Sequence, residues 1–329
     1  MAVLSNTVTV PSVGSAGGNR EDLSDILYNT EPTQTPFLTA AGRPKTASAF
    51  LHEWMIESLN AANKDNAGID GDGGETNSAK TPSSRVGNQA QLFRKVASVS
   101  DGQNAVSTAG NAYKMKREKA NKMLELKRDR EQAYLSNNPS VAANDTTAGK
   151  SGGMQAWLTS NVSRGSGGAS GGYSAGIVAA ATGGTDRAFT ETLFGDVLQS
   201  RFTNAGMPDG QLLAFMPASV KRIFSAFTGL AANRVNSNPS KDGAKITGAI
   251  EIYLSDFGEV LAVPHPYGFT GGEKACLIID PTYVGVAALK PIYTKVLAST
   301  GTADRELIAT YETLECNAEK AHAIVTDLL

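Results

Sequence analysis

The longest helical pattern in this 329-residue chain, residues 104–136, constrains its fold more than any other feature. It has no proline, one glycine (Gly110) and few β-branched residues, so its helix propensity is high. Apolar residues recur at roughly helical spacing, and residues 137–139, which end in proline, stop the pattern. The residues that set the spacing are Ala109, Tyr113, Ala120 and Leu124. The segment predicts a long, solvated strut.

Charged side chains of both signs cover the polar face of this predicted helix. Glu118 and Lys122 stand at i,i+4, a pair that contributes roughly 0.3 kcal/mol to a helix. The pattern indicates an ordinary solvated face, and the alternative is a surface that tolerates nucleic acid. The other charged residues are Lys114, Lys116, Lys119, Lys127 and Arg130 against Glu125, Asp129 and Glu131.

The N-terminal region has too little apolar surface to fold by itself. Residues 1–19 mix Ser, Thr, Val and Gly without a period and predict an extended arm, followed by a short helical turn at residues 21–28. Two prolines in residues 31–38 argue against a regular helix there. Phe37 and Leu38, at the end of this stretch, are expected to dock onto a folded body.

A projecting hairpin is predicted next. Residues 49–58 alternate polar and apolar side chains in part, as a strand does, and residues 88–100 predict a second strand. The polar segment between them, residues 59–85, contains the acidic, glycine-rich stretch 70–75. Because an isolated two-stranded hairpin is marginally stable in water, it should rest on another surface.

The rest of the chain predicts a compact α/β lobe and a final sheet. Residues 143–185 are dominated by glycine and small residues and are expected to be loop and connection rather than core, apart from an apolar helix at 154–158. The lobe would contain a helix at 190–205 closed by Gly206, a strand at 212–216, a helix at 217–229, and strands at 250–254 and 260–263. An antiparallel sheet would follow from strands at 275–280, 284–289, 292–298, 306–314 and 320–328, the last two joined by a tight turn at 317–319.

Composition excludes several classes of function. The formal net charge of -2 lacks the basic excess of a dedicated DNA-binding protein. No apolar stretch is long enough to span a bilayer, and residues 1–10 lack the features of a signal peptide, so we expect a protein made in the cytoplasm. Cys276 and Cys316 lie in apolar or strand-like contexts and are expected to be reduced core thiols.

Motifs that could carry catalysis or ligand binding are weak. Residues 148–151 end like a phosphate-binding loop, but Asn144 stands where that loop requires glycine, and Ser170 breaks a second glycine motif at 165–172. Asp70, Asp72 and Glu75 imitate the start of a calcium loop, yet Thr81 occupies its twelfth position. A charged contact between this acidic tip and a basic patch on a neighbour is the alternative. The three histidines, His52, His265 and His322, have no metal-ligand or triad spacing and are expected to be structural. We therefore assign no catalytic, cofactor-binding or metal residues.

Several strings along the chain, taken together, resemble one protein family. They are residues 22–29, 31–38, 52–54, 87–88, 125–129, 135–137, 313–315 and 319–322, and they cover the chain from about residue 20 onward, with 140–185 the weakest part. The set resembles the major capsid proteins of tailed bacteriophages, which have the Hong Kong 97-like fold.

This resemblance implies an α+β fold with five parts. They would be an N-arm (1–47), an E-loop hairpin (48–100), a first part of the peripheral domain (101–185) with its spine helix at 104–136, an axial α/β domain (186–283), and a peripheral return sheet (284–329).

The implied function is self-assembly without enzymatic activity. Hexamers and pentamers of the chain would form an icosahedral or prolate head around the double-stranded DNA genome. Expected partners are other copies of the chain, a scaffolding protein, a portal and, as an open question, a decoration protein; packaged DNA would be touched without sequence preference, and no membrane is involved. The chain would be made in the cytoplasm of a bacterial host and reside in the virion.

Two devices known in some relatives are not expected here. Because the arm begins almost at Met1, we expect a separate scaffolding protein and no proteolytic maturation, and we assign no lysine–asparagine crosslink. Inter-subunit contact candidates are Phe37, Leu38, Trp54, Asp70, Asp72, Glu75 and Arg85.

Two alternatives to a capsid subunit stay open at this point. A tail-tube or adhesin subunit would share the low charge, the many glycines and the β-rich end, although the charged strut argues against it. A nucleotide hydrolase would use Lys150 and Ser151.

Overall fold

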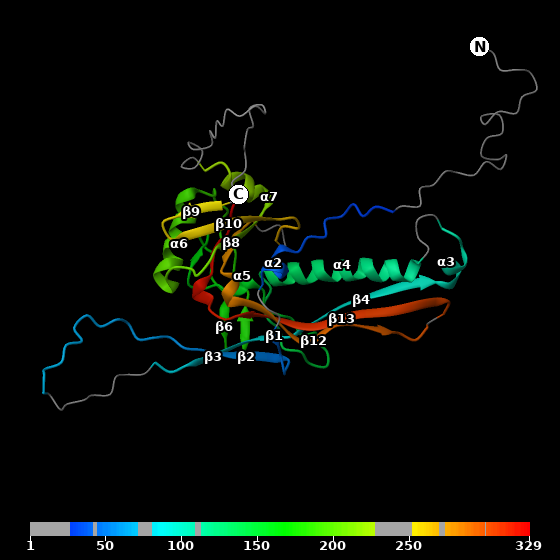
Figure 1. Cartoon of the computed structure of the whole chain (residues 1–329), viewed down its shortest axis with the longest axis horizontal. Helices are drawn as coiled ribbons and strands as arrows, with labels where there is room; N and C mark the ends of the chain where they lie inside the picture. Colours follow the sequence, from blue (N-terminus) through cyan, green and yellow to red (C-terminus); the bar gives the residue numbers. More distant parts are fainter. Residues whose placement is uncertain are drawn as a thin grey trace, which may run out of the picture.

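The computed structural model describes residues 27–41, 45–71, 81–108, 113–227, 252–269, 274–299 and 301–329. Two sheets form the body, one of four strands and one of six, and two two-stranded pairs lie beside them. Figure 1 shows a long helix over the four-stranded sheet on one side and a projecting hairpin on the other. The helices are α2 (Pro36–Ala40), α3 (Asp101–Ala105), α4 (Lys114–Leu135), α5 (Met154–Trp157), α6 (Glu191–Ala205) and α7 (Ala218–Phe224), with 3-10 turns η3 (Pro281–Tyr283) and η4 (Glu319–Ala321).

The four-stranded sheet is long and carries α4 on one face (Figure 1). Its strands, in order, are β1 (Lys45–Thr46), β12 (Val284–Val296), β13 (Ala303–Cys316) and β4 (Gln91–Ser100). Side chains alternate along β4, so that Phe93 is buried toward α4 while Leu92 and Arg94 are exposed on the opposite face. One face of this sheet is therefore core and the other is open along part of its length.

The six-stranded sheet holds the second half of the core. Its strands, in order, are β5 (Val162–Ser163), β14 (Ala323–Val325), β11 (Cys276–Ile279), β8 (Leu212–Pro217), β10 (Gly258–His265) and β9 (Ile252–Ser255). Helices α6 and α7 bury Phe194, Val220 and Phe224 against one face. Phe215 and Leu277, on the other face, belong to the same apolar cluster as the residues under α4. The two sheets thus share a continuous core.

Helix α6 matches its prediction because each of its ends has a local signal. Thr190 caps the first turn by accepting the N–H of Leu193 at 3.3 Å. Gly206 has φ +77° and closes the helix by donating its N–H to Phe202. The predicted helix at 190–205 and its glycine stop are confirmed.

The predicted strut at 104–136 is wrong at its start. Residues 104–105 end the short helix α3, Val106 is extended, and α4 begins only at Lys114. Val106, Ser107 and Thr108 stand in succession, and all three residue types favour non-helical backbone. The buried residues also lie in the last part of the helix rather than at the predicted spacing: they are Leu126, Glu131, Tyr134 and Leu135.

The strand partner predicted for the hairpin, residues 88–100, is right only at residues 88–89. Strand β2 (Leu51–Ile56) pairs with β3 (Ser84–Gln89), with Trp54 opposite Val86. The predicted second strand splits at Ala90, because β4 leaves the hairpin there and pairs with β13. The buried apolar side chains of β4 require a covered face, and the α4 side of the four-stranded sheet supplies it.

Two further predictions fail near the glycine-rich region and the C-terminus. The apolar helix expected at 154–158 is confirmed as α5, but the rest of 143–185 is more than connection, since Val178 is fully buried in the core. Glycines let this region pass close to α4: a Cβ at Gly153 would lie 2.0 Å from the carbonyl oxygen of Ser136. The segment 320–328 does not return onto β13. Its strand β14 is buried on both faces, which suits an interior position in the six-stranded sheet.

The remaining predicted helices and strands differ from the observed ones mainly in where they begin and end. Helix α2 starts within the proline stretch at Pro36, where the missing N–H of proline is tolerated. The strands expected at 284–289 and 292–298 form the single strand β12, with register shifts on either side of Lys290. The arm 1–19 and residues 21–26 lie outside the described residues, and 27–28 form no helix. A small pair, β6 (Gly172–Ser174) and β7 (Ile177–Ala179), completes the fold.

Candidate functional site

The root of the β2–β3 hairpin is fastened to the body by stacked aromatic rings. The rings of Trp54 in β2 and Trp157 in α5 lie 5.5 Å apart, and Trp157 stacks on Tyr173 of β6 at 5.7 Å with ring planes 2° apart. Such pairs contribute about 0.5–1.5 kcal/mol each beyond the area they bury. Trp54 therefore serves the hairpin root of its own subunit.

Two buried polar side chains, those of Asn88 and Glu315, lock the same root. Asn88 of β3 is fully buried; its amide nitrogen donates to the carbonyl of Leu314 at 2.9 Å, and its amide oxygen accepts the N–H of Gly152 at 2.8 Å. The buried carboxylate of Glu315 accepts from Lys45 Nζ at 2.7 Å and lies 3.2 Å from His52 Nε2. These contacts join β1, β2, β3 and β13, so His52 has a structural contact, as expected.

Beyond its root, most of the described part of the hairpin is exposed. Arg85 is 67% exposed and lies 3.4 Å from Glu53 across the strand pair, and Asp70 is exposed at the tip. Asp72 and Glu75 lie outside the described residues. Among the residues with described positions, no three or more His, Cys, Asp or Glu side chains gather closely enough to hold a metal ion.

The segment before β1 is held by a buried carboxylate. Glu131 of α4 is fully buried and accepts the backbone N–H of Phe37 at 2.7 Å and of Leu38 at 2.8 Å, while His265 Nε2 lies 3.2 Å from it. The Phe37 ring contacts Phe215 edge to face at 5.9 Å. The expectation that Phe37 and Leu38 dock onto a body is confirmed.

Phe37 and Leu38 differ as inter-subunit candidates. Phe37 has no exposed surface to offer to a neighbour, since it is part of the core of its own subunit. Leu38 is half-buried and lines a hollow of about 340 Å³ together with Lys127 and Val286. Leu38 therefore keeps surface that a neighbour could cover.

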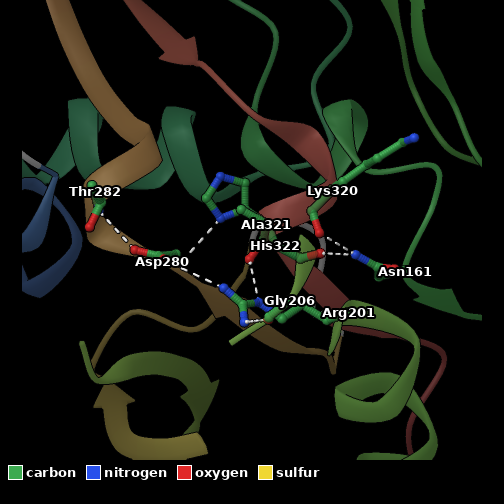
Figure 2. Close-up of polar contacts among 8 residues, drawn as sticks. All are labelled: Asn161, Arg201, Gly206, Asp280, Thr282, Lys320, Ala321 and His322. Atoms are coloured by element: carbon green, nitrogen blue, oxygen red, sulfur yellow. Dashed lines mark hydrogen bonds and ion pairs between the residues drawn. The ribbon is translucent and has the colours of Figure 1, made fainter. Parts of the chain in front are cut away.

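A buried charged network connects the six-stranded sheet to α6 (Figure 2). Arg201 of α6 is 1% exposed and donates to the carbonyls of Ala321 at 3.1 Å and Gly206 at 2.8 Å, and to Asp280 Oδ2 at 3.2 Å. The N–H of Asp280 in turn donates to Nδ1 of His322 at 3.1 Å. Burial first, and then the nearby Arg201 guanidinium, lower the pKa of His322 to about 3. The network is a structural clamp, because its hydrogen bonds join α6 to the residues that follow β11 and to η4 in the interior.

Acidification should weaken this clamp. The imidazole in the unfolded chain takes up a proton below its ordinary pKa of 6.5, whereas the folded one does so only near 3. The contribution of His322 to the free energy of unfolding is therefore fully present above pH 6.5 and is lost progressively as the pH falls toward 3. From pH 7 to pH 5 we expect the free energy of unfolding to fall by about 2 kcal/mol through His322 alone, measured by urea unfolding.

The matched control is His322→Asn, whose side-chain oxygen can accept the same N–H without titrating. Between pH 7 and pH 5, the free energy of unfolding of this variant is expected to fall by about 2 kcal/mol less than that of the wild type. Equal pH dependence in both proteins would contradict the assignment.

The remaining sequence motifs have structural explanations. Ser151 is buried and its hydroxyl accepts the N–H of Leu314 at 3.2 Å, while the backbone of Lys150 pairs with Val141. Cys276 and Cys316 are free and buried, and burial raises the pKa of both thiols, so they stay protonated. No helix within the described ranges is both long and apolar enough to cross a bilayer.

Sequence reasoning missed the buried polar residues that organise these contacts. Arg201 stands at helical spacing from Phe194, Val197 and Leu198 on the apolar side of α6, so the pattern did carry a signal. Glu131 was assigned to the polar face of the strut, although Tyr134 and Leu135, one turn later, are buried beside it. A charged residue on an apolar helical stripe is the signal that could have found both.

Comparison with known proteins tests the resemblance noted in the sequence. The profile of the SU10 major capsid protein family matches residues 6–329, nearly the whole chain. The chain belongs to this family. It is thus a major capsid protein of the tailed-phage type, and the family is one of structural shell proteins rather than enzymes. The tail-tube, adhesin and nucleotide-hydrolase alternatives are therefore set aside.

Individual relatives of this SU10-family capsid protein are distant in sequence. The major capsid protein of Escherichia phage Phieco32 is 27% identical over 119 residues, which are 36% of this chain and 33% of that protein. The match thus spans about a third of the length of that curated relative.

Solved structures agree over almost the full length. The cyanophage A-1(L) capsid asymmetric unit gives a TM-score of 0.65 at 11% identity, over 97% of this chain and 99% of that one. Gordonia phage Cozz gives 0.58 at 10% identity, over 100% and 98% of the two chains. At such identities the likeness shows the fold alone, which is the α+β, Hong Kong 97-like capsid fold.

Proposed function

We propose that this chain assembles as hexamers and pentamers into a closed icosahedral or prolate head around double-stranded DNA. The observation that carries the proposal is the projecting hairpin, whose tip exposes Leu59 at 95% and Ile69 at 80%. Apolar side chains gain about 25 cal/mol per Å² when they leave water. A segment that cannot bury them on its own body gains that burial only from a neighbour.

The parts of the fold would take the roles that the capsid family implies. Residues 1–47 would be the N-arm and 48–100 the E-loop, of which β2 and β3 form the hairpin while β4 joins the body. Residues 101–185 and 284–329 would make the peripheral domain around α4, and 186–283 the axial domain. Strand β14 supports a close union of the two domains, because residues 323–325 pair with β11 inside the six-stranded sheet.

Partners other than identical subunits are also proposals. A scaffolding protein and a portal are implied by the family, and a decoration protein stays open. Contact of α4 with packaged DNA has limited support, because Lys119 and Lys122 are paired with carboxylates at 2.7 and 2.8 Å. Lys116 and Lys127 remain exposed on the helix, so such a contact would be weak and without sequence preference.

The direct test is sedimentation of the overexpressed chain followed by negative-stain electron microscopy. The wild-type chain is expected to give closed shells or capsomer rings. A matched variant replaces residues 58–82 with a short Gly-Ser turn and keeps the hairpin root. It is expected to remain folded, with wild-type circular dichroism and thermal unfolding, but to give no shells. A wild-type chain that stays monomeric even with its scaffolding protein would contradict the proposal.

A further inference from the structure

One side of helix α4 carries a regular exposed stripe. From its N-cap to its last residue, the exposed side chains other than Asp129 recur every three or four positions, and all remaining residues are buried or half-buried. An alternation of three and four is the spacing of a seam by which one helix packs against another. The stripe extends over two heptads, or about 21 Å. Its residues are Tyr113, Lys116, Ala120, Met123 and Lys127, and we call it the α4 stripe.

The other sides of α4 are covered by the subunit itself. One side packs on β4 of the four-stranded sheet. Another side lies under the N-terminal segment, where Arg117 donates to the carbonyl of Leu27 at 3.5 Å and Arg128 lies 3.6 Å from Glu31. Figure 1 shows this segment running along the helix. The α4 stripe is therefore the side of the helix that the described part of the chain leaves open.

The charge on the α4 stripe is positive and unpaired. Every other charged side chain of α4 has an ion pair or a hydrogen bond. Lys116 contacts only the Tyr113 ring, 4.8 Å from its centroid, and Lys127 makes no ion pair within the described ranges. The two ammonium groups stand on residues about 16 Å apart along the helix axis. A partner for this stripe must bring negative charge to both ends.

The stripe continues into an apolar hollow. Lys127 lines the hollow of about 340 Å³ beside Leu38 and Val286. Arg130 also lines it but is already paired with Glu312, so Lys127 is the unpaired charge at its rim. The hollow has room for a bulky apolar side chain. A partner that follows the stripe can therefore bury such a side chain at its end.

We propose that the α4 stripe and its hollow form a docking surface for an amphipathic helix, bearing acidic side chains, of a different protein. The apolar side of this helix packs on Ala120 and Met123, where the small alanine allows close approach. Its carboxylates pair with Lys116 and Lys127 and set the register of the contact. The contact goes beyond the proposed assembly of identical chains, because it needs only one subunit.

Two other occupants suit the α4 stripe less well. A second copy of the same stripe would set Lys116 against Lys127 in an antiparallel pair, so like charges would meet at both ends. Nucleic acid would neutralise the lysines, but its phosphates would leave Tyr113 and Met123, which are 69% and 37% exposed, without apolar contact. An acidic amphipathic helix satisfies both the charged and the apolar positions.

A synthetic helix tests the surface on the full-length chain. The probe is a fluorescently labelled peptide of three heptads, with leucine at the two seam positions and glutamate beside them, so that its own charge keeps it from pairing with itself. A peptide of the same composition with its leucines shuffled off the seam is the matched probe. Fluorescence anisotropy is expected to show saturable binding of the helical probe and about tenfold weaker binding of the shuffled one, since only the first offers an apolar seam.

Three variants locate the binding. Lys116→Glu with Lys127→Glu is expected to weaken binding of the helical probe about tenfold or more, because like charges then meet. Met123→Lys is also expected to weaken it, whereas charge attraction alone would make this variant bind more tightly. Lys290→Glu with Lys295→Glu makes the same change in net charge at exposed positions of β12 and should bind like the wild type. Circular dichroism of each variant excludes unfolding as the cause.

Several results would overturn the docking surface. Equal binding of the two peptides, or tighter binding by Met123→Lys, would reduce the stripe to a site of charge attraction. Wild-type binding by the chain with both stripe lysines reversed would place the probe elsewhere, and no saturable binding of the helical probe would remove the proposal. Duplex DNA that displaces the probe and binds more tightly would assign the stripe to nucleic acid. None of these results bears on the proposed shell assembly, which is measured separately by sedimentation and microscopy.

Discussion

Replacing Arg201 by Met is expected to lower the free energy of unfolding by about 3–5 kcal/mol, because it leaves the buried carboxylate of Asp280 without its cation. Two backbone carbonyls, those of Gly206 and Ala321, lose their donor in the same step. The methionine fills most of the volume of the arginine stem, so a cavity contributes little. Urea unfolding at pH 7, where His322 is neutral in both states, measures the effect.

Two variants separate this effect from a general loss of charge. Arg201→Met combined with Asp280→Asn is expected to recover part of the stability, because the amide is neutral and can still accept the N–H of Thr282. Lys95→Met removes a partly exposed pair with Asp129 and should cost less than about 1 kcal/mol. If Arg201→Met cost no more than Lys95→Met, the network in Figure 2 would not be a clamp.

The elements that could be predicted from sequence carry their signals within a few residues. Helix α6 has a capping threonine, an apolar stripe and a terminal glycine, all local, and the structure places its ends within one residue of the prediction. The capsid resemblance likewise rested on short strings, and the family match confirms it. Local sequence signals and the short strings shared with the capsid family were enough to predict the fold class.

The features that could not be predicted depend on contacts between distant parts of the chain. No local pattern in residues 84–100 predicts that the strand divides at Ala90. The division depends on distant pairing, because the residues before Ala90 pair with β2 and those after it pair with β13. The burial of Glu131 depends on the backbone of Phe37, 94 residues away. The residues that share the open face of the four-stranded sheet are likewise brought together only when β4, β12 and β13 come into register.

The root of the hairpin is held by contacts within the subunit, whereas residues farther along it are exposed, and this difference matters for assembly. The side chain of Asn88 in the hairpin root finds its hydrogen-bond partners within the subunit, whereas Leu59 and Ile69, farther along the hairpin, are exposed. The root thus fixes where β2 and β3 leave the body before any neighbour is present. Less ordering entropy then remains to be lost on contact, which favours association.

The segment that contains α2 is also held by a buried polar side chain of its own subunit. Removing that side chain is the second substitution for which we expect a large loss of stability. Glu131→Ala is expected to lower the free energy of unfolding by about 3–5 kcal/mol, because the buried carboxylate is the acceptor for two backbone N–H groups at the start of α2 and also contacts His265. Without it, Phe37 and Leu38 keep their apolar contacts but α2 loses the acceptor for its first turn.

Two measurements check this expectation. Chemical unfolding gives the loss of stability, and limited thermolysin digestion with mass spectrometry reports whether the bond before Phe37 becomes accessible, since that side chain is fully buried in the wild type. Glu131→Gln keeps one acceptor oxygen and is expected to lose about half as much. Glu125→Gln, on the same helix but in a partly exposed pair with Lys122, should change stability by less than about 1 kcal/mol and leave the digestion pattern unchanged. Equal digestion of Glu131→Ala and wild type would mean that apolar packing alone holds this segment, and that the carboxylate is not what anchors it.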